Sequence, residues 1–87
     1  MVKVSVVIPI YNMERYLSSN LDSVLSQTLQ EIEVICVDDG SSDRTPEILK
    51  QYSSKDSRIR ILTQGNQGVG SARNNGMKAT VGKYIAF

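Results

Sequence analysis

Two adjacent aspartates, Asp38 and Asp39, are the residues of this 87-residue sequence whose type and position first suggest chemistry. They follow the apolar run 34–37 (Val-Ile-Cys-Val) and precede the turn-forming segment 40–43 (Gly-Ser-Ser-Asp). A short apolar run that is rich in β-branched residues and closed by a turn indicates a strand buried on both faces of a parallel sheet. Open α/β sheets bind ligands beyond the carboxyl ends of their strands, where a carboxylate can accept from a ribose hydroxyl or a base N–H. We therefore expect the aspartate pair at a ligand site.

The aspartate pair also has structural interpretations. An aspartate after a strand often caps the next helix, but Asp43 and Thr45 are better placed to cap a helix that has Pro46 as its first residue. Gly40 allows the tight turn that separates the pair from that helix. A metal role within this segment is a weaker hypothesis, because side chains alternate along a strand and the two carboxylates need not converge.

A glycine-rich segment, 65–70 (Gly-Asn-Gln-Gly-Val-Gly), is the second place where a ligand could bind. A dinucleotide fingerprint would have to follow the first strand directly, and a P-loop would require lysine at the position of Ser71. The loop still offers backbone amides at a helix N-terminus, and Arg73 in the first turn of that helix could bind an anion. The alternative is a plain surface connection with Arg73 solvated or paired to a carboxylate.

An aromatic residue completes the set. Tyr11 follows the first predicted strand and should lie beside the acidic turn, where its ring could either pack or stack on a base. Tyr11, Asp39 and Arg73 thus come from three successive strand ends. Together they predict a site for a base, a hydroxyl or base N–H, and a phosphate.

Apolar periodicity predicts four strands alternating with three helices, in a mostly parallel sheet with right-handed crossovers and helices on both faces. The third strand is expected nearer an edge. The predicted strands cover residues 2–8 (stopped by Pro9), 32–37, 59–62 and 83–87, and the predicted helices run from after Asn12 to Gln27 or Thr28, from 46 to 53 and from 71 to 80.

Composition limits the class of protein. A net charge of +1 argues against a nucleic-acid binder that relies on a broad basic surface. The apolar runs are far shorter than the roughly 20 residues that span a bilayer, and the N-terminus lacks the apolar region of a signal peptide. The lone Cys36 fits a small core residue better than a reactive thiol. These features predict a reducing, cytoplasmic setting.

Four ordered motifs resemble the large second family of glycosyltransferases, which have the GT-A fold. They are Val4 to Asn12 (VSVVIPIYN), Leu25 to Thr28 (LSQT), Val37 to Thr45 (VDDGSSDRT) and Gly68 to Gly76 (GVGSARNNG). The resemblance implies inverting, hexosyltransferase-type transfer from a nucleoside-diphosphate sugar, with a UDP-sugar expected, to a glycan or lipid-linked acceptor. It also implies cell-envelope polysaccharide synthesis, in the cytoplasm or at the inner face of the membrane.

The resemblance assigns nucleotide-binding roles to nine residues. The segment from Pro9 to Asn12 would line the base and ribose pocket, the aspartate pair would hold the uracil or ribose, and Arg73 would lie near the nucleotide. Met13 stands where the family often has an acid, for which Glu14 could substitute. The expected site residues are Pro9, Tyr11, Asn12, Glu14, Asp38, Asp39, Gly40, Gly68 and Arg73.

The family's Asp-x-Asp motif, which binds Mn²⁺ or Mg²⁺ against the diphosphate, would begin directly after a strand such as 84–87. The sequence ends there, so neither the metal ligands nor a later general base is expected in it. We therefore expect residues 1–87 to be the N-terminal, nucleotide-binding part of one GT-A domain, inactive alone. A non-catalytic nucleotide-binding module is the main alternative, followed by a receiver-like or dinucleotide-binding domain. An open sheet edge also predicts self-association.

Overall fold

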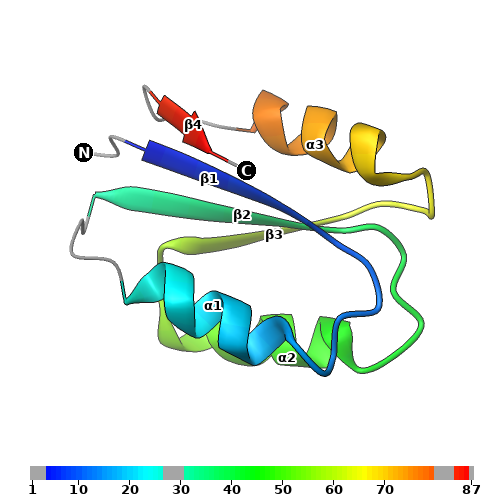
Figure 1. Cartoon of the computed structure of the whole chain (residues 1–87), viewed down its shortest axis with the longest axis horizontal. Coiled ribbons are helices and arrows are strands. Elements are labelled where there is room, and N and C mark those ends of the chain that lie inside the picture. The colour runs from blue at the N-terminus through cyan, green and yellow to red at the C-terminus, as the bar shows by residue number, and fades with distance from the viewer. Residues whose placement is uncertain (1–3, 27–30, 80–83, 87) are drawn as a thin grey trace.

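Across residues 4–26, 31–79 and the backbone of 84–86, which a computed structural model describes, four parallel strands form one sheet. The strand order is β3-β2-β1-β4, and the three described helices are divided between the two faces (Figure 1). The elements are β1 (Val4–Ile10), α1 (Leu17–Leu25), β2 (Ile32–Asp38), α2 (Thr45–Lys55), β3 (Ile59–Thr63), α3 (Val69–Lys78) and β4 (Tyr84–Ala86). The predicted fold class is confirmed.

Strand β2 is buried along its whole length, as its continuous apolar run predicts. It lies between β1 and the edge strand β3, which confirms the predicted edge position of β3. Because side chains alternate across a strand, β2 contributes to two cores. Val34 and Cys36 pack with Leu17, Leu21 and Leu49 from α1 and α2, and Ile35 and Val37 pack with Val7 and with Ala72 from α3.

The prediction that Pro9 ends the first strand is wrong, because β1 continues to Ile10 with Pro9 paired opposite Val37. In a parallel ladder, alternate residues bond to opposite neighbours. The carbonyl of Ile10 accepts from Asp39 N on the β2 side, which places the nitrogen of Pro9 on the β4 side. The described pairing with β4 covers only Val4 to Val6, so the missing N–H of Pro9 removes no bond to β2.

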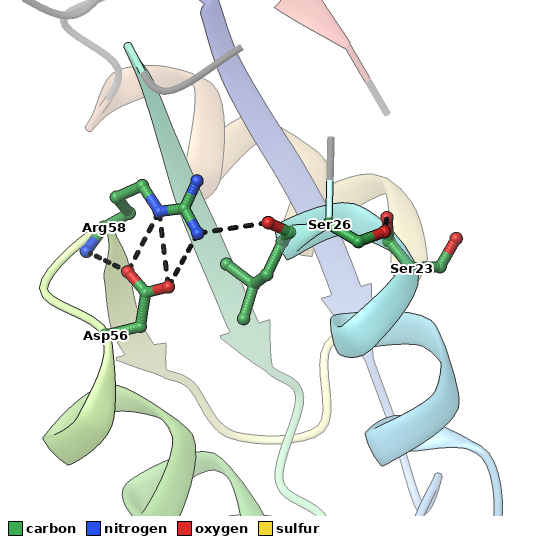
Figure 2. Close-up of polar contacts among 5 residues, drawn as sticks. Ser23, Ser26, Asp56 and Arg58 are labelled. Carbon is green, nitrogen blue, oxygen red and sulfur yellow. Dashed lines mark hydrogen bonds and ion pairs between the residues drawn. The ribbon is translucent and has the colours of Figure 1, made fainter. Parts of the chain in front are cut away.

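Helix α1 is shorter than its apolar pattern predicts. It begins at Leu17 because residues 13–16 form a turn in which the amides of Tyr16 and Leu17 both bond to Met13 O. It ends at Leu25, whose carbonyl accepts from Arg58 Nη2 at 3.2 Å. Figure 2 shows Arg58 between the end of α1 and Asp56, with which it forms an ion pair of 2.8 Å. The predicted helix end at residues 27–28 lies outside the described residues.

Helices α2 and α3 begin one and two residues earlier than predicted. Thr45 is the first residue of α2 rather than its N-cap, and its amide donates to Asp43 Oδ1 at 2.9 Å. Helix α3 begins at Val69, so Arg73 lies in its second turn rather than its first. Strand β4 confirms the predicted fourth strand at Tyr84–Ala86. None of the described helices has the length and apolar character required to span a bilayer.

Candidate functional site

The loops that follow β1 and β2 are joined by hydrogen bonds at the carboxyl edge of the sheet. Asn12 N donates to Ser41 Oγ at 2.9 Å, and Ser42 N donates back to Asn12 Oδ1 at 2.8 Å. Met13 N donates to the buried Thr45 Oγ1 at 2.9 Å, and Glu14 N donates to Asp43 Oδ2 at 3.2 Å. These bonds explain Ser41, Asp43 and Thr45, whose side-chain oxygens accept from backbone amides that no sheet or helix satisfies.

Two residues of these loops have left-handed backbone conformations. Asn12 has φ +49°, a conformation that asparagine tolerates better than most residues. Gly40 has φ +74°, and a Cβ built there would lie 3.1 Å from the amide nitrogen of Asn66. The loops after β2 and β3 therefore approach closely at a position that favours glycine for both reasons. Gly40 shapes the site through its backbone, and Asn12 does so through its backbone and its side-chain oxygen.

Asp39 accepts three hydrogen bonds at the carboxyl edge of the sheet. Its Oδ1 accepts from Gln64 Nε2 at 2.8 Å and from Gln67 N at 2.7 Å, and its Oδ2 accepts from Gly68 N at 2.9 Å. Only 5% of the residue is exposed. Hydrogen bonds from the Gln64 side chain and from the Gln67 and Gly68 amides lower the pKa of the Asp39 carboxyl, against the raising effect of burial. Asp39 therefore ties the glycine-rich loop to β2 as a charged carboxylate.

Asp38 faces the other side of the sheet. It is 3% exposed, and its Oδ1 accepts from Ser41 N at 3.0 Å, which closes the turn after β2. The two carboxylates diverge, as the alternation of strand side chains predicts. Among the described residues, no group of three or more histidine, cysteine, aspartate or glutamate side chains could hold a metal ion. The described residues therefore offer no ready-made cluster of protein ligands for a divalent ion.

A surface hollow lies against Asp39, between the end of β1 and the start of α3. Its lining residues are Pro9, Ile10, Tyr11, Asp39, Val69 and Ala72. Tyr11 is 47% exposed and Val69 is 56% exposed, so an aromatic and an aliphatic side chain form open walls. A hollow with apolar walls and a single carboxylate can take a flat, mostly apolar group that presents an N–H or O–H donor.

The structure brings only part of the predicted set to the hollow. Three of the predicted residues, Pro9, Tyr11 and Asp39, are among its lining residues. Gly68 reaches it through the bond of its amide to Asp39, and this residue is the N-cap of α3 with φ +99°. Arg73 is exposed on α3, one turn beyond Val69 on the same side of the helix, and does not line the hollow.

The remaining expectations are revised in the structure. Glu14 contributes its backbone amide to the loop contacts, and its side chain is exposed away from the lining. The predicted anion-binding amides of the glycine-rich loop are partly occupied, because those of Gln67 and Gly68 donate to the chain's own carboxylate. These two amides are therefore not open to an anion in this structure.

Sequence reasoning missed Gln64 and Asn75. Gln64 bonds to Asp39, and its Oε1 accepts from Asn75 Nδ2 on α3. A signal for Gln64 was available, because it is the first residue after β3 as Asp39 is the first after β2, and parallel strand ends meet at one edge. Asn75 carried no such signal, since its contact depends on the rotation of α3 about its own axis.

A parallel sheet with helices on both faces and a carboxylate-lined hollow at the carboxyl ends of its strands defines a ligand-binding α/β unit of the doubly wound class. The model of the family described as "Glycosyl transferase family 2" matches residues 5–87. The chain therefore belongs to glycosyl transferase family 2. It is 49% identical over 84 residues to the "Uncharacterized glycosyltransferase EpsJ" of Bacillus subtilis, covering 97% of this chain and 24% of that protein.

Other relatives and solved structures agree with this assignment. Glycosyltransferase GlyA of Streptococcus pneumoniae is 44% identical over 85 residues, covering 98% of this chain and 12% of that protein. S. aureus TarS 1-349 in complex with UDP superposes with a TM-score of 0.87 at 33% identity, over 95% of this chain and 25% of that chain. The mannosyltransferase PcManGT of Pyrobaculum calidifontis, in complex with GDP-Man and Mn²⁺, has a TM-score of 0.88 at 23% identity, covers 95% and 26% of the two chains, and shows the shared fold.

The chain spans about a quarter or less of the length of the curated relatives named above. The predicted family and the GT-A type of fold are confirmed by these comparisons.

Proposed function

We propose that this chain supplies the nucleotide-binding half of a glycosyltransferase that transfers a sugar from a UDP-sugar, with inversion, to a glycan or lipid-linked acceptor. The observation that carries the proposal is the position of Asp39 at the hollow between β1 and α3, beside the open ring of Tyr11. The family assignment and the UDP in the similar TarS structure support it. Polysaccharide synthesis of the hexosyltransferase type in the cytoplasm, or at the inner face of the membrane, belongs to the same proposal.

The residues of the hollow have separate roles in this proposal. Tyr11 stacks on the base, and Asp39 accepts a hydrogen bond from a base N–H or a ribose hydroxyl. Arg73, one turn of α3 beyond the Val69 wall, contacts the diphosphate. Pro9 forms part of the floor, while the backbones of Asn12, Gly40 and Gly68 hold the loops in place. Asp38 and Glu14 act on the shape of the loops through Ser41 and Asp43.

A divalent ion, Mn²⁺ or Mg²⁺, belongs to the proposed activity of the whole enzyme, where it would neutralise the leaving diphosphate. The Mn²⁺ in the PcManGT complex supports this part of the proposal. Because the described residues offer no fitting ligand set, we assign this chain no step that involves the ion. The tasks of the described residues are to bind and orient the nucleotide.

Replacing Tyr11 by alanine should weaken UDP binding roughly 5- to 150-fold, because base–aromatic stacking contributes about 1–3 kcal/mol per base. Calorimetric titration of UDP into the wild-type chain and the variant measures this, with NAD as the comparison ligand. Tyr16→Ala is the matched control, since Tyr16 is 65% exposed and does not line the hollow. Equal affinities of the wild-type and Tyr11→Ala chains, or wild-type binding of NAD but not UDP, would contradict the proposal.

We also propose that the chain associates with itself through strand β3, which has a neighbour on only one side in the described sheet. The amide of Gln64 and the carbonyl of Arg58 bond to β2, so the peptide groups of Ile61 and Thr63 face the open side, whereas the amide of Ile59 donates to Asp56 O. Sedimentation velocity over a concentration series should show a rising mean mass, reduced by Thr63→Pro, which removes an edge N–H. A constant monomer mass at high concentration would refute this.

A further inference from the structure

Gln64 is fixed in place more firmly than a residue of a surface loop requires. Its backbone amide donates to Asp38 O at 2.9 Å, which continues the ladder between β2 and β3. Its side-chain amide uses both ends, since Nε2 donates to Asp39 Oδ1 at 2.8 Å and Oε1 accepts from Asn75 Nδ2. A side chain bonded at both ends of its amide has a defined orientation. Gln64 therefore presents a donor, and not an acceptor, to Asp39.

The contact with Gln64 limits what Asp39 can still accept. A carboxylate has about four acceptor positions, two on each oxygen. On Asp39, Oδ1 already receives the Gln64 side chain and the Gln67 amide, and Oδ2 receives the Gly68 amide. The bonds among the described residues leave one acceptor position open, and it lies on Oδ2. Asp39 can therefore accept one hydrogen bond from a ligand but not two bonds spread over both oxygens.

Bases differ in the number of adjacent donors that they present. Uracil has one ring N–H, at N3, between two carbonyl oxygens. Guanine presents its N1–H and its exocyclic amino group side by side, and a carboxylate pairs with both only when each of its oxygens has an open acceptor position, in the bidentate manner that it uses with arginine. A guanine bound at Asp39 would leave one of these donors without its partner, which is costly because Asp39 is buried and the donor would be shielded from water there.

We infer that Gln64, held by Asn75, is a positioning residue that makes the Asp39 site selective for uracil over guanine by occupying Oδ1. This inference rests on the proposed nucleotide-binding function of the hollow. It assigns Gln64 a task beyond loop structure, because a structural contact would not change the relative affinities for two bases. The selectivity is set through Asp39, and Gln64 itself does not contact the nucleotide.

The test measures the ratio of UDP to GDP affinity by calorimetric titration into the chain and its variants. We expect Gln64→Leu, which removes the side-chain donor and frees one of the two acceptor positions on Oδ1 while the Gln67 amide keeps the other, to reduce the preference for UDP about tenfold. Asn75→Leu, which removes only the support of Gln64, should shift the ratio in the same direction by less. Gln64→Lys restores a donor to Asp39 and should retain the wild-type ratio. Gln51→Leu, an exposed position on α2, is the matched control.

The outcomes separate this inference from the proposed function. If the wild-type chain binds neither nucleotide, the proposed function is refuted and the inference falls with it. If it binds UDP and the ratio is the same in Gln64→Leu and Asn75→Leu, the inference is refuted while the proposed function stands. Thermal unfolding monitored by circular dichroism identifies any variant that fails to fold. Should Gln64→Leu be such a variant, the ratio in Asn75→Leu decides, because that variant retains the Gln64 side chain.

Discussion

Replacing Asp39 by alanine should weaken UDP binding roughly 10- to 100-fold, because a hydrogen bond to a charged group is lost from the base and the loop that shapes the hollow is released at the same time. The variant leaves the amides of Gln67 and Gly68 and the side chain of Gln64 without their common acceptor. Titration calorimetry of UDP measures the effect on binding, and thermal unfolding measures the effect on the fold.

The control for Asp39 is Asp56→Ala. Asp56 is partly buried and, like Asp39, accepts several hydrogen bonds, which in its case come from Arg58 (Figure 2). It lies before the start of β3, at the opposite end of the sheet from the hollow. Asp56→Ala should lower the unfolding temperature without changing the UDP affinity of the folded chain. Retention of full UDP affinity in Asp39→Ala would show that the base binds elsewhere.

The same carboxylate predicts a dependence on pH. The bond from the Gln64 side chain, followed by those from the loop amides, lowers the pKa of Asp39 below its ordinary value of 3.8 in the folded chain. The unfolded chain therefore binds this proton at a higher pH than the folded chain does. The stability contributed by Asp39 is fully present above pH 3.8 and is lost as the pH falls through the lowered pKa. UDP binding should likewise persist until the pH falls to the lowered pKa of Asp39.

Replacing Gly76 by alanine should destabilise the fold by about 1–3 kcal/mol, the usual cost of overpacking a core. A Cβ at this position of α3 would lie 2.3 Å from Val7 Cγ1 and 3.2 Å from Val37 Cγ2. Val7 is fully buried and β-branched, so its side chain cannot turn aside easily. The gain of about 0.5–1 kcal/mol in helix propensity does not offset this contact. The unfolding temperature should fall by roughly 4–8 °C for each kcal/mol.

Gly70→Ala is the matched control for the Gly76 prediction. Both glycines lie in α3, but no atom lies within 4 Å of a Cβ built on Gly70. The control should therefore leave the unfolding temperature unchanged or raise it, because alanine can add up to about 1 kcal/mol to the free energy of unfolding. An unfolding temperature for Gly76→Ala that equals or exceeds that of the wild-type chain would show that α3 does not pack against β1 and β2 at this distance.

The class of fold, the order of elements and the central place of β2 follow from the sequence alone. The unbroken apolar run before Asp38 can be satisfied only by burial on both faces, and this requirement already implies helices on each side of the sheet. Local patterns also locate the carboxyl edge of the sheet, because the turn residues 40–43 directly follow the apolar run and so mark the end at which the strand stops. The family resemblance of the motifs was likewise present in the residues themselves.

Only the tertiary structure decided which atoms meet at the edge of the sheet. The sequence could place Asp39 near a ligand, but not show that three of its acceptor positions are taken by Gln64, Gln67 and Gly68. Those bonds join segments about 25 to 29 residues apart, and their formation depends on strand register and on the position of α3. Hydrophobic periodicity determines which face of an element is buried, whereas a hydrogen bond of 2.8 Å requires that two packed elements be placed to within a fraction of an ångström.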